Sequence, residues 1–142
     1  MSIPSVKKTL FIIVFSALFL IPLLGTSQPS RIKVPKRMSK ITTTDKFVSK
    51  TFELYNKVFI YDSLTIAGVE IPGELEDELM ESAVRDIDSL WEVVPDIIDD
   101  ISDASFMKQA KATLNLNKAK KALKYCGNYM KSTVVGKKED EE

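Results

Sequence analysis

Residues 44–61 read TDKFVSKTFELYNKVFIY, and the spacing of their apolar side chains indicates the fold class. Apolar positions recur every three or four residues, which is the period of an α-helix with a buried face. Two such rows run side by side: Phe47, Thr51, Leu54, Val58 and Tyr61, and Val48, Phe52, Tyr55 and Phe59. A helix with so wide an apolar face is expected to pack against more than one neighbour.

This first helix is predicted to begin at Thr44 and to end near Ala67, where Gly68 offers a left-handed C-terminal turn. Residues 58–71 are also rich in β-branched and aromatic side chains, so a hairpin over this range is an alternative. Pro72 opens a second predicted helix, because a missing N–H does no harm in a first turn. Its apolar row is Leu75, Leu79, Ala83, Ile87, Leu90 and Val94.

Two more helices complete the pattern. Pro95 is expected to end or kink the second helix, because its ring clashes with the preceding turn. A short helix over 96–102 then directs Ile97, Ile98 and Ile101 inward. A long last helix follows Asp103 and is predicted to end near Val134 and Gly136. Its buried row is Ala112, Leu116, Ala119, Leu123, Cys126 and Met130.

The chain of 142 residues is therefore predicted to be all-α. We expect a small antiparallel helical bundle of three long helices and one short one, behind an N-terminal hydrophobic signal or anchor helix. The expected division is 1–27 as a signal peptide or N-terminal membrane anchor, 28–43 as a basic linker, 44–135 as the helical bundle domain, and 136–142 as a disordered charged tail.

The N-terminal segment has the three parts of a secretory signal. Two lysines precede an apolar stretch over 10–24, and the small residues Gly25, Thr26 and Ser27 follow it. This pattern predicts cleavage near Ser27 and export, to the periplasm or outside the cell. However, five basic residues follow at once, and positive charge resists translocation. A retained segment, and hence a single-pass membrane protein, is the alternative.

The net charge of zero conceals three charged segments. Residues 31–58 contain eight basic and two acidic residues, 62–103 contain one basic and fourteen acidic residues, and 104–133 contain seven lysines and no acid. We expect the acidic middle helix to pack between the two basic ones. Exposed ion pairs stabilise by only about 0–1 kcal/mol, so the apolar rows would hold the bundle and charge would select its arrangement.

Composition argues against catalysis. The chain has no histidine and a single cysteine, which excludes Ser-His-Asp triads, Cys-His pairs and multi-cysteine metal sites. We expect no enzyme activity, no cofactor and no metal. Four carboxylates at helical spacing lack the glycine and alternating ligands of an EF-hand loop, and we interpret them as a solvated acidic face. They are Asp96, Asp99, Asp100 and Asp103.

Single residues have simple interpretations. Cys126 is expected to be a buried small apolar side chain, with an intermolecular disulfide as the alternative. Trp91 is expected in the core. Lysines and tyrosines alternate in the last helix, a pattern that nucleic-acid-binding proteins also show. Because the neighbouring segment is acidic and export is predicted, we expect no nucleic-acid partner.

The basic residues after the apolar segment form a candidate membrane-surface site. They are Arg31, Lys33, Lys36, Arg37 and Lys40. They could contact anionic lipid or could belong to a flexible spacer. The sequence as a whole favours a non-catalytic exported helical protein that acts by protein–protein interaction with an unknown partner. The alternative is a membrane-anchored accessory subunit with its bundle at the membrane surface.

Overall fold

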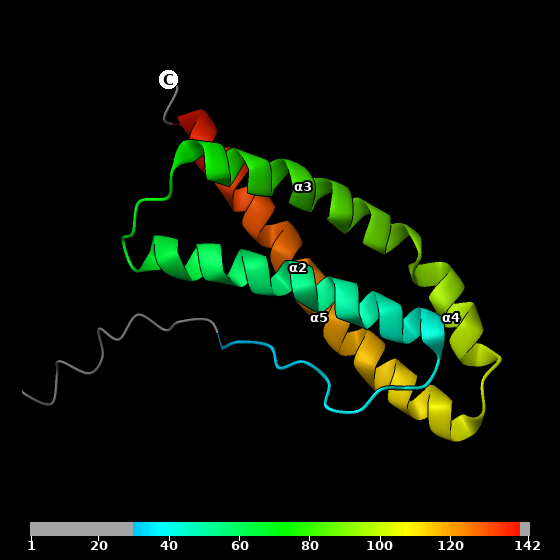
Figure 1. Cartoon of the computed structure of the whole chain (residues 1–142). Coiled ribbons are helices and arrows are strands. Elements are labelled where there is room, and N and C mark those ends of the chain that lie inside the picture. Colours follow the sequence, from blue (N-terminus) through cyan, green and yellow to red (C-terminus); the bar gives the residue numbers. More distant parts are fainter. Residues whose placement is uncertain (1–29, 140–142) are drawn as a thin grey trace, which may run out of the picture. The chain divides into compact units, whose positions relative to one another are not determined.

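The computed structural model describes residues 30–139, and all regular secondary structure in that range is helical (Figure 1). The elements are α2 (Thr42–Ile66), α3 (Gly73–Glu92), α4 (Val94–Ser102) and α5 (Phe106–Glu139). The all-α prediction is confirmed. The predicted signal or anchor over 1–27 lies outside the described residues. None of the described helices has an apolar stretch long enough to cross a bilayer.

A carboxylate holds the chain just before α2. Asp45 accepts hydrogen bonds from the backbone N–H groups of Ser39 and Lys40, at 2.8 and 2.9 Å, and from the Ser39 hydroxyl at 2.7 Å. Lys40 has a φ of 65°, a left-handed conformation that is uncommon for a residue with a side chain. The Asp45 contacts with Ser39 and with Lys40 itself stabilise the reversal that leads into the helix.

The end of α2 agrees with the prediction. Gly68 has a φ of 74°, and its N–H donates to the Thr65 carbonyl at 3.0 Å. Residues 58–66 are helical, so the hairpin alternative over 58–71 is wrong. Val58 is buried in the core, whereas Ile60, Ile66 and Val69 in this range are exposed.

The predicted interruption by proline is also present. α3 ends at Glu92, and α4 begins at Val94 with Pro95 in its first turn, where no helical N–H partner is lost. The chain therefore resumes a helix almost at once, two residues earlier than the expected start at Asp96.

The chain reverses direction between α2 and α3 and again between α4 and α5, while α4 continues in roughly the direction of α3, so α2 and α5 run the same way (Figure 1). Asn115 near the start of α5 bonds to the segment before α2, and Tyr125 further along bonds to Asp62 near the end of α2. α2 packs most extensively against α5, while α3 contacts both. The expected antiparallel arrangement therefore holds for α2 with α3 and for α4 with α5. The first and last helices are parallel because two reversals of the chain separate them.

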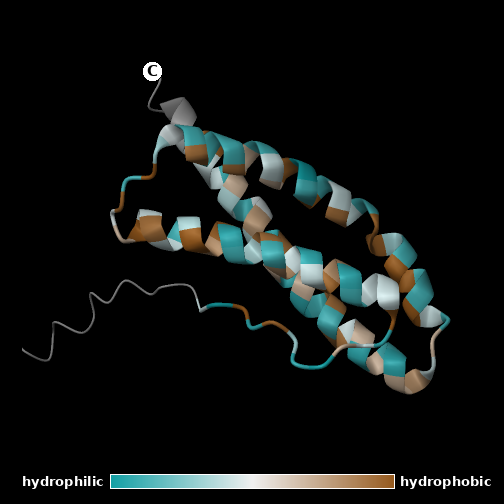
Figure 2. Ribbon diagram, viewed as in Figure 1, coloured by the Kyte–Doolittle hydropathy of each residue, from teal (hydrophilic) through white to brown (hydrophobic). Residues whose placement is uncertain are grey.

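One continuous apolar core joins the helices (Figure 2). The row predicted for α5 is buried throughout, and so are the rows predicted for α2 except for the half-buried Phe59 and Tyr61. The core-facing side of α5 is made largely of small residues with no exposed surface: Ala112, Ala119, Ala122 and Cys126. These short side chains let the aromatic residues of α2 approach closely.

Three residues predicted to lie in the core are exposed: Leu75, Trp91 and Ile98. The reason is helical geometry. A step of four positions turns a row by about 40° around the axis, so a long row of such steps leaves the buried face. Around the helix axis, Leu75 and Trp91 lie on opposite sides of the buried face of α3, which is centred on Leu79, Ala83 and Ile87. Ile98 is displaced in the same way from Ile97 and Ile101.

The last helix is longer than predicted. It continues through Gly136 to Glu139, although glycine was expected to end it. An internal glycine lowers helix stability by about 1 kcal/mol, which neighbouring residues of good helix propensity can offset.

The packing of α5 yields a matched stability test. Leu123 is fully buried, whereas Leu114 on the same helix is 66% exposed. We expect Leu123→Ala to lower the free energy of unfolding by about 2–5 kcal/mol, because it opens a cavity in the core. Leu114→Ala should change it by no more than about 0.5 kcal/mol. Urea unfolding followed by circular dichroism measures both, and equal effects would contradict this assignment of faces.

Candidate functional site

The basic linker forms an ordered segment, here called the arm (residues 31–41), that lies along α2 and reaches α5. The backbone N–H of Ile32 donates to the Tyr55 hydroxyl at 2.8 Å. The Arg31 guanidinium donates to the Asn56 side chain at 2.7 Å and lies 5.5 Å from the centre of the Phe59 ring. Toward its other end, the Arg37 carbonyl accepts a hydrogen bond from Asn115 at 2.8 Å.

The five predicted membrane-surface residues all lie on this arm, and all are exposed. Arg31 is fixed by the contacts just described, and the Arg37 backbone is held by α5. The description of this segment as a flexible spacer is therefore wrong for 31–41. The chain before α2 was predicted to be irregular because it has no periodicity. The groups that hold it, Tyr55 and Asn115, are far away in sequence.

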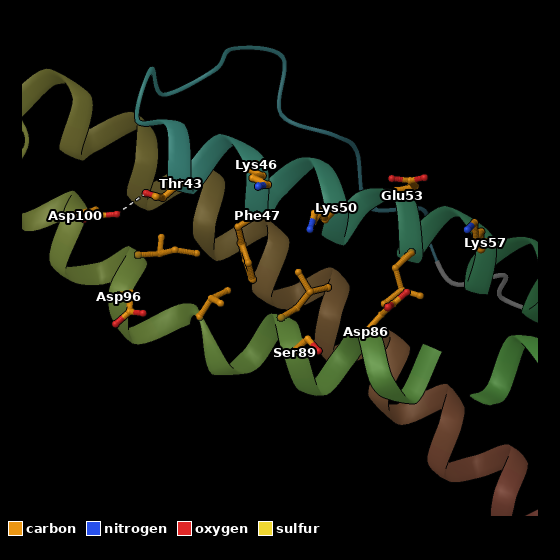
Figure 3. A pocket seen from close by; sticks show the side chains of 14 residues that line it. Thr43, Lys46, Phe47, Lys50, Glu53, Lys57, Asp86, Ser89, Asp96 and Asp100 are labelled. Atoms are coloured by element: carbon orange, nitrogen blue, oxygen red, sulfur yellow. Dashed lines mark hydrogen bonds between the residues drawn. The ribbon is translucent and has the colours of Figure 1, made fainter. Parts of the chain in front are cut away.

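A groove of about 590 Å³ lies between α2 on one side and α3 and α4 on the other (Figure 3). Its floor is apolar and mostly buried, and is formed by Phe47, Leu54, Leu90 and Ile97. The sequence rows predicted these four residues as core but gave no indication that an open groove would run above them.

The two walls of the groove carry opposite charges. The α2 wall presents three lysines and one glutamate, and the wall formed by α3 and α4 presents three aspartates. In Figure 3 the Lys50 side chain points toward α3, and the Glu53 carboxylate points away from the groove. The charged residues are Lys46, Lys50, Glu53 and Lys57 on one wall and Asp86, Asp96 and Asp100 on the other.

A hydrogen bond joins the two walls at one end of the groove. The Thr43 hydroxyl, in the first turn of α2, donates to the Asp100 carboxylate at 2.6 Å (Figure 3). The groove is therefore an open seam of the bundle that ends at the Thr43–Asp100 bond.

The acidic residues predicted as a solvated face are exposed: Asp96, Asp99, Asp100 and Asp103. Within the described residues, no three carboxylate or cysteine side chains are arranged to hold a metal ion. Two of the four, Asp96 and Asp100, line the groove. Their association with the lysines of α2 was not predicted, because it depends on how α2 and α4 lie relative to each other.

A second polar contact lies near the other end of α2, where the Tyr125 hydroxyl donates to Asp62. Burial raises the pKa of the Tyr125 phenol, and the hydrogen bond to Asp62 raises it further, so the phenol stays protonated. The Tyr125 ring also packs edge-on against Tyr55, with the ring centres 5.3 Å apart. These contacts fix α5 against α2 at the level where the arm begins.

Cys126 is a free, buried thiol in this core, as predicted. Burial raises the pKa of the thiol to about 12, so the neutral form is favoured in the folded state. We expect no reaction with a thiol reagent such as DTNB at pH 8 in the native protein, and full reaction after unfolding in guanidinium. Rapid reaction of the native protein would contradict the packing of α5.

The same pKa implies a pH dependence of stability. The pKa of the Cys126 thiol is higher in the folded protein than the usual value of about 8.5 in an unfolded chain. The protonated thiol therefore contributes fully to stability below about pH 8.5, and this contribution is lost as the pH rises toward 12. The melting temperature should fall between pH 9 and 11. Cys126→Ala should reduce this fall without abolishing it, since Tyr125 shifts in the same direction. An equal fall in both proteins would exclude a contribution from the thiol.

Comparisons with known proteins give no match to a protein-family model, to a curated protein or to a solved structure. What the groove binds is therefore argued from its own side chains. Its distinctive features are a lining that extends over about four turns of α2 and two walls of opposite charge.

Proposed function

We propose that this chain is a non-catalytic protein that binds a helical segment of another protein in the groove between α2 and α3–α4. The observation that carries the proposal is the groove itself, whose apolar floor lies between a lysine wall and an aspartate wall. An apolar seam between two helices is a common docking site for the apolar face of a third.

The length of the groove suits a short helix. On α2 its lining extends from Thr43 to Lys57, which corresponds to about 21 Å at 1.5 Å per residue. A partner helix of about 14 residues would span it. Such a helix would lie beside α2, α3 and α4 and would convert the open seam into the closed interior of a four-helix arrangement.

The walls define the chemistry of the partner. A helix whose apolar face rests on Phe47 and Leu90 would direct one flank toward the lysines and the other toward the aspartates. Acidic residues on the first flank and basic residues on the second would complement both walls. Because turning a helix end to end exchanges its flanks, the charges would also select the direction in which the partner lies. Charge complementarity of this kind contributes mainly to specificity.

We propose that the bundle acts after export directed by residues 1–27, with cleavage near Ser27. The alternative is a membrane-anchored accessory subunit in which residues 10–24 stay in the bilayer. The arm supports this alternative, because its fixed first residue, Arg31, would hold the bundle within a few residues of the anchor. The groove is compatible with either location.

Synthetic peptides test the binding proposal. Three 18-residue helical peptides share one apolar face, and their flanks are acidic and basic, both acidic, or both basic. We expect the mixed peptide to bind at least about tenfold more tightly than the other two, a difference of about 1.4 kcal/mol, because each single-sign peptide meets one repulsive wall. Isothermal titration calorimetry with the full chain gives the three affinities.

A charge reversal in the groove provides the second arm of this experiment. Lys50→Glu should weaken binding of the mixed peptide several-fold, whereas Lys118→Glu, an exposed lysine of α5 outside the groove, should leave it unchanged. Equal affinity for the three peptides, or equal effects of the two variants, would rule out recognition by the charged walls. Absence of binding by all three peptides would count against the groove as a helix site.

A further inference from the structure

One end of the bundle exposes a concentration of aliphatic side chains, here called the end face. It is formed by the last turns of α2, the turn that follows, the start of α3 and the last turns of α5. Its members are between 38% and 57% exposed: Ile60, Leu64, Ile66, Val69, Leu75, Val134 and Val135. Five of the seven fall within residues 60–75, so this is a local concentration and not a scatter of single residues.

Contacts between the helices place these segments at the same end. Tyr129 of α5 lies near Thr65 of α2 and Glu76 of α3. Val134 and Val135 lie further along α5. The last turns of α5 and the start of α3 lie at the same end of the bundle (Figure 1). The arm starts near this end as well, because Arg31 is bound to Asn56 and packed on Phe59.

The chain that precedes the arm indicates what covers the end face. The apolar stretch over 10–24 ends seven residues before Arg31. Seven extended residues span at most about 24 Å. Since Arg31 is fixed beside the end of α2, a bilayer that contains residues 10–24 must lie within that reach of Phe59.

The charges near the end face are mixed. Arg31, Lys33 and Lys57 lie on the arm and α2, and Asp62, Glu70 and Glu74 lie among the apolar residues. Contact with a membrane here would therefore depend on aliphatic burial and not on attraction to anionic lipid. The opposite end exposes Phe106 and Met107, but these lie beside Asp99 and Asp103, and the anchored end of the arm is remote from them.

We infer that the end face rests against the interfacial layer of the lipid bilayer when residues 10–24 are held in the membrane. The inference rests on the membrane-anchored alternative and is independent of the groove, so either could fail without the other. It moves the predicted membrane contact from the arm to the aliphatic end of the bundle. The groove, which runs from Thr43 to Lys57 along α2, would then remain accessible to a partner.

Environment-sensitive labels on the full chain test this. Because Cys126 is buried, introduced cysteines react selectively with an NBD reagent. Ile66→Cys and Val69→Cys place the label on the end face, and Ser105→Cys places it on the exposed turn at the opposite end. The proteins are reconstituted into phosphatidylcholine vesicles, with and without phosphatidylglycerol, and with or without a nitroxide quencher carried on the lipid.

We expect the two end-face labels to shift to shorter emission wavelength and to lose intensity to the lipid-borne quencher in both lipid mixtures. The Ser105 label should do neither. With the label at position 69, Leu64→Gln combined with Ile66→Gln should reduce the shift. The matched pair Val84→Gln and Ile98→Gln, which are equally exposed elsewhere, should not.

Three results would overturn the inference. Emission from the end-face labels that matches the Ser105 label would mean that the end face is in water. A shift to shorter wavelength without quenching by lipid would mean that protein covers it, either residues 10–24 of the same chain or a second copy. Dependence on phosphatidylglycerol alone would return the membrane contact to the basic arm and would likewise exclude aliphatic contact by the end face.

Discussion

The packing of α2 on α5 is the contact on which the other features depend. Bulky aromatic side chains of α2, such as Phe52 and Tyr55, belong to the same buried core as the alanine and cysteine side chains of α5. Large residues facing small ones allow two helices to approach closely and fill the space between them without voids. Because the interface is apolar, its formation does not depend on the net charge of the outer faces of the two helices. The outer face of α5 is rich in lysine.

Several consequences follow from this contact. It brings Asn115 of α5 and Tyr55 of α2 to the side where the arm lies. It also leaves α3 with limited contact to α2, because α3 shares the core mainly through α5. The space between α2 and α3–α4 is then bordered by lysines and aspartates, whose charged groups are more stable in water than in a closed seam. An open groove is the result.

The sequence predicted the parts of the fold that depend on local chemistry. Helical periodicity located the buried faces, Gly68 and Pro95 located a helix end and a break, and the burial of Cys126 followed from its neighbours along the helix. The predictions that were wrong, and the features that were not predicted, depend on geometry between residues that are distant in sequence. Trp91 turns away from the core by helical rotation, and no local pattern reveals that Tyr55 and Asn115 bind the arm.

The candidate site was predicted least well for the same reason. Phe47 and Leu90 were recognised as apolar, and Asp96 and Asp100 as an acidic face, but their association across a seam depends on the positions of α2, α3 and α4. The five basic residues predicted as a membrane-surface site all lie on the arm and are exposed. The structure adds that the arm is held against the bundle by contacts with Tyr55, Asn56 and Asn115.

The parallel packing of α2 and α5 is tested most directly by distances between spin labels measured with pulsed electron paramagnetic resonance. One label at Lys131 on α5 is paired either with a label at Thr65, at the end of α2, or with one at Lys46, near its start. These two α2 positions are 19 residues apart, or about 28 Å along the helix. Parallel packing predicts that the Thr65 pair is much the shorter. A shorter distance for the Lys46 pair would show that the helices run in opposite directions and would contradict the arrangement from which the arm, the groove and the end face are derived.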